Sequence, residues 1–281
     1  MKTRANILVY GVLIFVSALA VFPILYTISN SFMRASEIQW YYGSLGTENS
    51  QINPFHLIPN RITFSGYYQM LFARPHYLMK FWQSLGLSLA IVTGQLVISI
   101  LGGYAFSKFR FPGRDILFFF LIALMMMPMQ VMLVPGYITL DAMGLIGSYS
   151  ALILPASFSA FGVFLICQFM SSIPDVILES AKIDGAGHFL ILRKILLPNC
   201  KAGLASLVIL SFIDSWNMVE QPLVYLRDSL KNPFSLFLLQ INEFEPALGF
   251  ACGVLAILPV LLLFLFFEEE LISGISYSVL K

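Results

Sequence analysis

ESAKIDGAGHFLILRKILLP, residues 179–198, carries five charged side chains in a chain that is otherwise strongly hydrophobic. Of the 281 residues, 58% are hydrophobic, 26 are Phe and only 11% are charged. Soluble domains carry about 25% charged residues, so this chain has more apolar surface than a soluble fold can bury. The composition therefore predicts a polytopic membrane protein, and residues 179–198 predict a segment that lies in water.

Long apolar runs predict the spans, because about 20 apolar residues of helix cross a bilayer core about 30 Å thick. We expect six spans, near residues 7–29, 82–106, 116–137, 149–171, 202–226 and 248–267. Each should be a helix, because a helix is the only structure in which a single segment pairs all of its own backbone groups in lipid. The first run begins like a secretory signal, but it continues to Tyr26 and predicts an uncleaved anchor. We therefore expect an all-α integral membrane protein, with residues 1–281 forming one transmembrane domain.

The basic residues predict the orientation, because cytoplasmic segments carry an excess of Lys and Arg. With the N-terminus inside, ten basic residues fall on the cytoplasmic side: Lys2, Arg4, Lys108, Arg110, Arg114, Lys182, Arg193, Lys194, Lys201 and Lys281. Six fall outside: Arg34, Arg61, Arg74, Lys80, Arg227 and Lys231. We therefore expect both termini, residues 172–200 and the tail at 268–281 in the cytoplasm. The aromatic loop at 34–81 is expected to form a small ordered cap outside.

Residues 172–200 predict a short helix-turn-helix outside the membrane. Ser172 is a candidate cap and Pro174 fits the first turn of a helix. Gly185 should turn the chain, after which residues 188–197 form a second segment that Pro198 stops. For a generic loop of this kind, an amphipathic connector resting on the membrane surface is the more ordinary interpretation.

The residue types in this loop resemble a known family. The pattern Glu-x-Ala-x-x-Asp-Gly-Ala at 179–186, closed by Leu-Pro at 197–198, resembles the cytoplasmic signature loop of ABC importer permeases. Ser180 stands where that family usually has Ala, which keeps a small residue there. Other stretches resemble the shorter, six-span subunit of the maltose-type, sugar-importing branch, and these are AFSKFRFPGR at 105–114, MPMQV at 127–131, GL at 144–145, WN at 216–217 and PL at 222–223.

The resemblance implies an ABC type I importer permease fold in a bacterial cell membrane, with a cytoplasmic coupling helix that docks on an ATPase. It implies these coupling residues: Glu179, Ser180, Ala181, Asp184, Gly185 and Ala186. Asp184 has an equally simple interpretation as a helix-ending cap. The implied partners are a homologous second permease, an ABC ATPase dimer, an extracellular or periplasmic solute-binding protein and a sugar. The tail at 268–281 resembles only loosely family tails that touch the ATPase.

Several functions are disfavoured by what the sequence lacks. It contains no Gly-x-x-x-x-Gly-Lys-Ser/Thr phosphate loop, so we expect no enzyme activity and no cofactor on this chain, with ATP and Mg used by the partner ATPase. A net charge of +1 and no basic, aromatic groove argue against nucleic acid. Cys167, Cys200 and Cys252 are widely spaced and read as small buried hydrophobes, and no metal-ligand spacing occurs.

Polar side chains inside the predicted spans mark a candidate substrate pathway, because such groups in lipid usually face a cavity. The candidates are Gln130, Asp214, Trp216, Asn217, Glu220 and Gln221. On one continuous helix, Asn217, Glu220 and Gln221 would share a face. Amide and aromatic groups suit a sugar, although hydrogen bonding between helices explains any single residue as well. The rival functions are an ion-gradient-driven transporter or channel that uses Asp214 and Glu220, and a non-transporting membrane scaffold.

Overall fold

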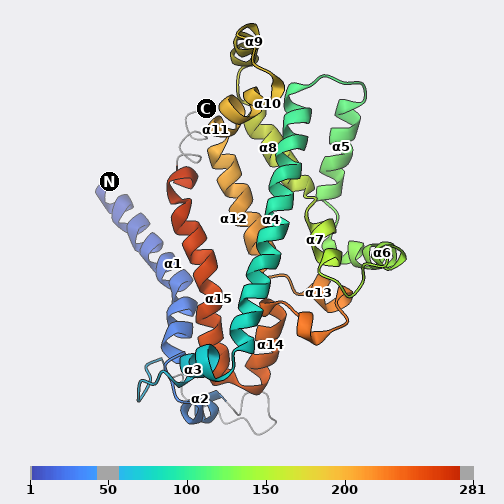
Figure 1. Ribbon diagram of the computed structural model, residues 1–281. Helices are drawn as coiled ribbons and strands as arrows, with labels where there is room; N and C mark the ends of the chain where they lie inside the picture. Colours follow the sequence, from blue (N-terminus) through green and yellow to red (C-terminus); the bar gives the residue numbers. More distant parts are fainter. Residues whose placement is uncertain (1, 43–56, 273–281) are drawn as a thin grey trace. The chain divides into compact units, whose positions relative to one another are not determined.

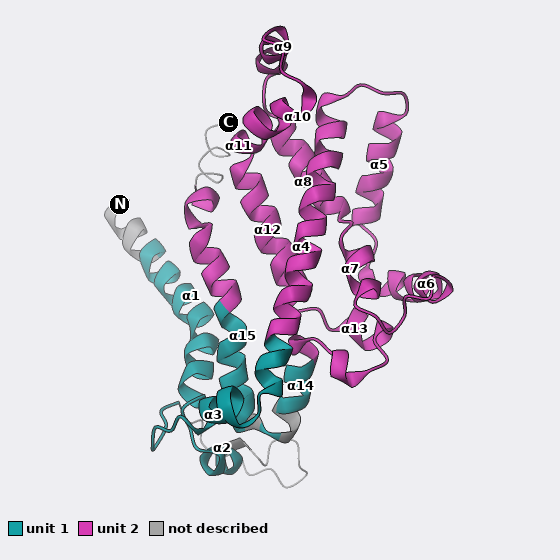
Figure 2. Ribbon diagram, viewed as in Figure 1, with its two compact units in different colours: residues 1–81, 237–258 teal, residues 82–236, 259–281 magenta. Residues whose placement is uncertain are grey.

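The computed structural model describes residues 2–42 and 57–272, and within those ranges the chain is helical, without strands (Figure 1). The expectation of an all-α fold is therefore confirmed. The chain forms two compact units, residues 1–81 with 237–258 and residues 82–236 with 259–281 (Figure 2). The single transmembrane domain expected for the whole chain stays a prediction.

The first unit contains long helix α1 and the short helices that follow it. Its elements are α1 (Lys2–Asn30), α2 (Ala35–Tyr42), α3 (Ser65–Tyr68), the π-helical turn η1 (Gln69–Ala73) and parts of α4 (His76–Lys108), α14 (Phe234–Phe244) and α15 (Pro246–Phe266). Tyr26 of α1 meets Phe250 of α15 edge-on, with ring centroids 6.1 Å apart. Arg74 Nη1 lies 2.7 Å from the Glu245 carboxylate, which joins the start of α4 to the start of α15.

The predicted cap at 34–81 is partly helical. It contains α2, α3 and η1, and residues 43–56 lie outside the described residues. Helix α4 begins at His76, six residues before the span expected at 82–106. A hollow of about 460 Å³ lies beside α2 and is lined by Arg34, Ser36, Glu37, Trp40, Tyr41, Asn60 and Arg61.

The second unit holds most of the remaining helices. They are α5 (Arg114–Met125), α6 (Met129–Ala142), α7 (Ser150–Ala156), α8 (Ala160–Ser171), α9 (Asp175–Ile183), α10 (His188–Ile191), the π-helical turn η2 (Leu192–Leu196), α11 (Leu197–Asn199), α12 (Lys201–Trp216), α13 (Glu220–Tyr225) and the 3-10 turn η3 (Ser229–Lys231). One apolar cluster joins α4, α8, α9, α10 and α12, and a second joins α4, α6, α7 and α13. The two clusters lie toward opposite ends of this unit (Figure 1).

The number of spans agrees with the expectation of six when broken helices are included. Four stretches are each long and apolar enough to cross a membrane, and these are Val9–Asn30, His76–Lys108, Ser150–Ser171, which contains α7 and α8, and Ala247–Phe266. Two further helix pairs reach that length only together, Arg114–Met125 with Met129–Ala142 and His188–Asn199 with Lys201–Trp216. The described residues therefore hold four to six candidate spans.

The predicted span at 149–171 is divided into α7 and α8 by residues 157–159, and two further predicted spans are not single helices either. The run at 116–137 breaks at residues 126–128, where α5 and α6 are bent by 106°. Pro128 has an extended ψ of 136° and precedes the first residue of α6, and proline disfavours helix in the residue before it. The run at 202–226 ends its first helix at Trp216, and α13 starts again at Glu220. The prediction of one helix across either run is wrong.

Two adjacent glycines let α4 approach α8 closely. A Cβ on Gly102 would lie 3.0 Å from Val163 Cγ1, and a Cβ on Gly103 would lie 2.8 Å from Ile166 Cγ2 and 2.9 Å from the Cys167 backbone nitrogen. Small residues at helix crossings allow this backbone approach, which in lipid supplies much of the packing energy. The backbone of α8 leaves no room for a side chain at Gly103.

We predict that Gly103→Ala destabilises the protein by about 1–3 kcal/mol, because the new methyl group must push α4 away from α8. Gly86→Ala is the matched control on the same helix, since a Cβ there meets nothing within 4 Å. Thermal unfolding of the two purified variants in detergent measures the difference. Equal midpoints for the two variants would contradict the close packing at Gly103.

Candidate functional site

Helix α9 stands beyond the ends of α4 and α8, at one end of the second unit (Figure 1). It starts directly after Pro174, whose backbone is extended and which supplies no side-chain cap. Ser172, the predicted cap, instead ends α8: its hydroxyl donates to the carbonyl of Phe169 at 2.7 Å. The start of the helix is therefore determined by Pro174 rather than by Ser172.

The turn after α9 is a Schellman motif, which ends a helix on a left-handed residue. Gly185 has φ +85°, and its N–H donates to the carbonyl of Lys182 at 3.0 Å. The Ala186 N–H donates to the carbonyl of Ala181 at 2.9 Å. Asp184 occupies the C-cap position, one of the two interpretations of its place in the sequence. The pattern Ala-x-x-Asp-Gly-Ala at 181–186 therefore covers the residues that form this turn.

The two faces of α9 differ. Leu178 is only 5% exposed and belongs to the apolar cluster with Ile166 and Ile191, and the two alanines of the turn pack against the same cluster. The opposite face is exposed and carries Glu179, Ser180, Val176, Ile177 and Ile183. The carboxylate of Glu179 has no hydrogen-bond or ion-pair partner among the residues that the structure describes. The inner face anchors α9, and the outer face is available to another molecule.

The second half of the predicted helix-turn-helix is longer than expected. Helix α10 continues through η2 into α11 as far as Asn199, so Pro198 does not stop it. The π-helical turn η2 directly precedes the short helix that contains this proline. The direction changes at Cys200, where the segment meets α12 at 80°.

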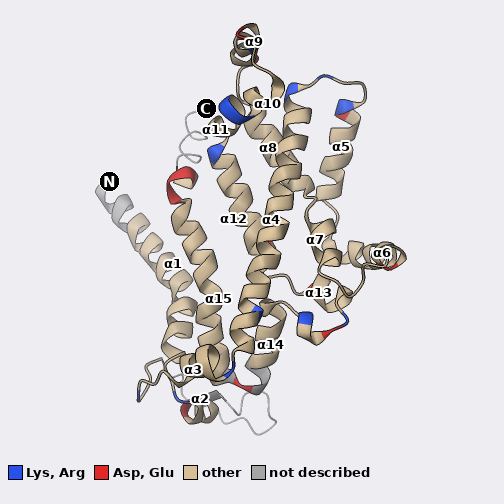
Figure 3. Cartoon of the chain, viewed as in Figure 1, with Lys and Arg blue, Asp and Glu red and all other residues tan. Residues whose placement is uncertain are grey.

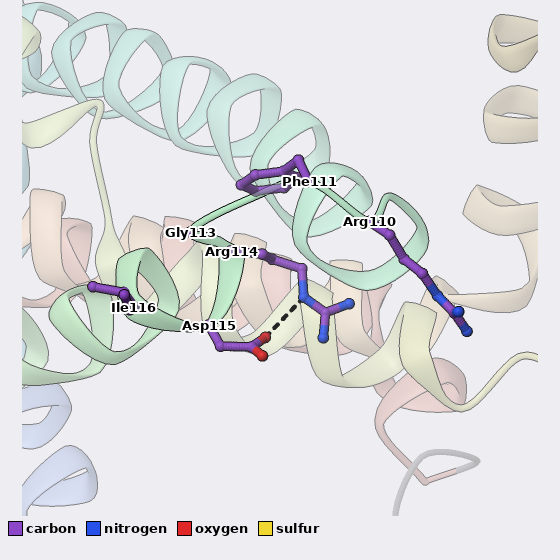
Figure 4. A pocket seen from close by; sticks show the side chains of 6 residues that line it. All are labelled: Arg110, Phe111, Gly113, Arg114, Asp115 and Ile116. Carbon is purple, nitrogen blue, oxygen red and sulfur yellow. Dashed lines mark hydrogen bonds and ion pairs between the residues drawn. The ribbon is translucent and has the colours of Figure 1, made fainter.

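Basic residues gather at the α9 end of the second unit (Figure 3). They are Lys108, Arg110, Arg114, Lys182, Arg193, Lys194 and Lys201, against Arg227 and Lys231 at the other end. A hollow of about 560 Å³ lies at the turn between α4 and α5. Figure 4 shows the residues that line it: Arg110, Phe111, Gly113, Arg114, Asp115 and Ile116. Arg114 Nε donates to the Asp115 carboxylate at 2.9 Å.

The structure brings three of the predicted pathway residues together. Gln130, at the start of α6, donates from Nε2 to both oxygens of Glu220 at 3.1 and 3.3 Å. Gln221 Nε2 lies 2.8 Å from the sulfur of Met129. The break between α5 and α6 therefore meets the start of α13 through the exposed Gln130 and Glu220 and the half-buried Gln221.

The other predicted pathway residues are arranged differently from the expectation. Asn217, Glu220 and Gln221 do not share one helix face, because α12 ends at Trp216. Asn217 is exposed, and its amide donates to the carbonyl of Ile213 at 3.0 Å. Asp214 is exposed on α12.

Trp216 is a packing residue in this structure. Its side chain is only 4% exposed and stacks on Phe212, with ring centroids 5.6 Å apart and the planes at 13°. Its place in the substrate pathway stays a prediction.

Gln95, which was not among the predicted site residues, joins three helices. Its Nε2 donates to the carbonyl of Ala156 at 2.7 Å, and its Oε1 accepts the hydroxyl of Ser211. Helices α4, α7 and α12 are thereby joined inside the apolar region. An amide near the middle of the 33-residue helix α4 was the available signal, since such a group in lipid needs a partner. Within the described residues, no group of three His, Cys, Asp or Glu side chains could hold a metal ion.

Comparison with known proteins identifies the family. Residues 95–275 match the family described as "Binding-protein-dependent transport system inner membrane component". The chain is 29% identical to the sn-glycerol-3-phosphate transport system permease protein UgpE of Brucella abortus (strain 2308), over 96% of both chains. It is 30% identical to the arabinooligosaccharides transport system permease protein AraQ of Halalkalibacterium halodurans, over 95% of this chain and 93% of that one.

A solved structure supports the fold. A chain in the crystal structure of a bacterial ABC transporter involved in the import of the acidic polysaccharide alginate matches with a TM-score of 0.80 and 23% identity, covering 96% of this chain and 97% of that chain. The resemblance found in the signature loop thus extends through the whole chain. The protein belongs to the family of binding-protein-dependent transport system inner membrane components, the permease subunits of ABC importers.

Proposed function

We propose that this chain forms half of the translocation pathway of an ATP-driven importer for sugars or related solutes, and that α9 is its contact with a cytoplasmic ATPase. The observation that carries the proposal is the two-faced structure of α9. Leu178 anchors its inner face to the membrane helices, while the outer face with Glu179 and Ile183 is exposed. A partner that moves this helix would move the helices packed beneath it.

The other partners follow from the family. A binding-protein-dependent system implies a solute-binding protein, and a permease without a phosphate loop implies an ATPase dimer that uses ATP and Mg. A homologous second permease would complete the pathway. Family membership also favours this function over an ion-gradient-driven transporter, a channel or a scaffold.

The substrate class rests on the relatives and on the polar residues near the broken helices. UgpE and AraQ are named for sn-glycerol-3-phosphate and arabinooligosaccharides, which points to carbohydrates or related polyols. The exposed Gln130 and Glu220, with the half-buried Gln221, offer both donors and acceptors for hydroxyl groups. Asp214 and Asn217 are exposed on the same segment of chain and belong to the proposed pathway.

The proposed orientation places the α9 end of the second unit, and both chain termini, in the cytoplasm. Seven Lys and Arg residues at that end against two at the other support it (Figure 3). The native cysteines 167, 200 and 252 are all buried, so an introduced cysteine can be labelled over a low background.

We predict that Ile183→Cys, 87% exposed on α9, reacts with a membrane-impermeant maleimide in inside-out vesicles that lack the ATPase, and not in right-side-out vesicles. Leu230→Cys, 73% exposed in η3, should show the opposite pattern, because it lies at the other end of the second unit. Gel-shift labelling of both preparations measures this. Reaction of Ile183→Cys from outside would reverse the proposed orientation.

We predict that Gly185→Val reduces ATP-dependent solute uptake at least tenfold, because a β-branched residue at φ +85° strains the turn that ends α9. Gly187→Val is the matched control: φ is −73° there, and neither glycine has an atom within 4 Å of an added Cβ. Uptake into cells, normalised to the permease in the membrane, measures both variants. If Gly185→Val imports normally, α9 is not the coupling element.

We predict that Glu220→Gln raises the KM for the imported solute about tenfold, because a hydrogen bond from a sugar hydroxyl to a carboxylate is stronger than one to an amide by about 1–2 kcal/mol. Asp141→Asn is the matched control, since it removes an exposed carboxylate that is paired with Arg227 at 3.4 Å. Initial rates of uptake against solute concentration give both KM values. An equal change in KM in the two variants would show that Glu220 does not bind the solute.

A further inference from the structure

Lys108, the last residue of α4, has a buried side chain with two acceptors. The side chain is only 5% exposed. Its Nζ donates to the backbone carbonyl of Ile173 at 2.6 Å and to the carboxylate of Asp175 at 2.7 Å. Ile173 lies between α8 and α9, and Asp175 is the first residue of α9. Burying an ammonium group is unfavourable unless it is paired and hydrogen-bonded, so these two contacts define its position.

Tyr104 makes a similar contact one helical turn earlier on α4. Its hydroxyl lies 3.1 Å from Nδ1 of His188, the first residue of α10. Phe109 packs against both rings, with centroids 5.0 Å from Tyr104 and 5.1 Å from His188. Residues four apart on a helix share a face, so Tyr104 and Lys108 reach the coupling segment from the same side of α4.

We propose that Lys108 and Tyr104 form a two-point clamp that fixes both ends of the coupling segment, residues 175–188, to the end of α4. This proposal rests on the proposed function and concerns how the movement of α9 reaches the membrane helices. Helices α8 and α10 adjoin this segment along the chain, whereas α4 is separated from it by more than 60 residues. The clamp makes α4 follow α9 directly, and Lys108 and Tyr104 are positioning residues.

Charges around the clamp are consistent with an ionised pair. Lys108 holds the pKa of the Asp175 carboxyl below its usual range, with further contributions from Arg110 and Lys182. Asp175 is largely exposed, whereas the ammonium of Lys108 is not. Removing Lys108 therefore leaves a solvated carboxylate rather than a buried charge, and the variant is expected to fold.

The principal test compares Lys108→Met, Lys108→Arg and Lys201→Met in proteoliposomes that contain the permeases, the ATPase and the binding protein. The measured quantity is the amount of solute imported per ATP hydrolysed. Lys108→Met should lower this ratio at least fivefold with the complex intact. Lys108→Arg keeps a cation in reach of both acceptors and should retain more than half of the wild-type ratio. Lys201→Met removes an exposed cation at the same end and should leave the ratio unchanged.

Tyr104→Phe removes only the hydroxyl that contacts His188 and should lower the ratio about twofold. Asp175→Asn combined with Lys108→Met should give the same import ratio as Lys108→Met alone, because both changes break the same contact between Lys108 and Asp175. A normal ratio in Lys108→Met, or equal losses in Lys108→Met and Lys201→Met, overturns the clamp.

A second measurement does not depend on transport. Spin labels at Ile183→Cys on α9 and Leu101→Cys on α4, both exposed positions, report the distance between the two helices in the purified permeases without the ATPase, which would cover Ile183. A narrow distance distribution that broadens in Lys108→Met supports the clamp, and an unchanged distribution overturns it. A wild-type complex that imports without ATP would overturn the proposed function instead, so the two failures are distinguishable.

Discussion

The apolar cluster at the α9 end is the contact on which the rest of the second unit depends. Leu178 enters it from α9, Ile166 from α8, Ile191 from α10, and Tyr104 from α4. Burying an aliphatic side chain of this size contributes about 1.5–3 kcal/mol. Without the cluster, a nine-residue helix of mixed polarity would be marginal in water, because short isolated helices are not stable alone. Packing at one face therefore makes α9 a structured element.

Polar contacts then determine how the packed helices are aligned. Gln95 connects α4 to α7 and α12, and the Gln130–Glu220 contact connects α6 to α13. Each joins segments that lie far apart in the sequence and replaces hydrogen bonds that lipid cannot supply. The apolar surface holds the helices together with little directional preference, and these few side chains specify which turn faces which.

The sequence predicted the helical class, the approximate places of the spans and the turn at Gly185, because composition and local residue types determine them. It did not predict which proline breaks a helix. Pro23, Pro135 and Pro259 lie within continuous helices, whereas Pro128 marks a bend of 106°. The difference is tertiary, since α13 contacts the first residues of α6 beyond that bend. The same cause explains why Glu220 and Gln130 could be named as candidates but not as neighbours.

The exposed face of α9 also has a consequence for the life of the subunit in the cell. Val176, Ile177 and Ile183 present apolar surface to water on a segment that also carries polar side chains. Such a patch on an unassembled chain is a signal for chaperones and proteases, and it promotes aggregation. A subunit synthesised in excess of its partner would be removed, while an assembled one would be protected. If the proposed ATPase covers this face, its exposure distinguishes an unassembled subunit from an assembled one.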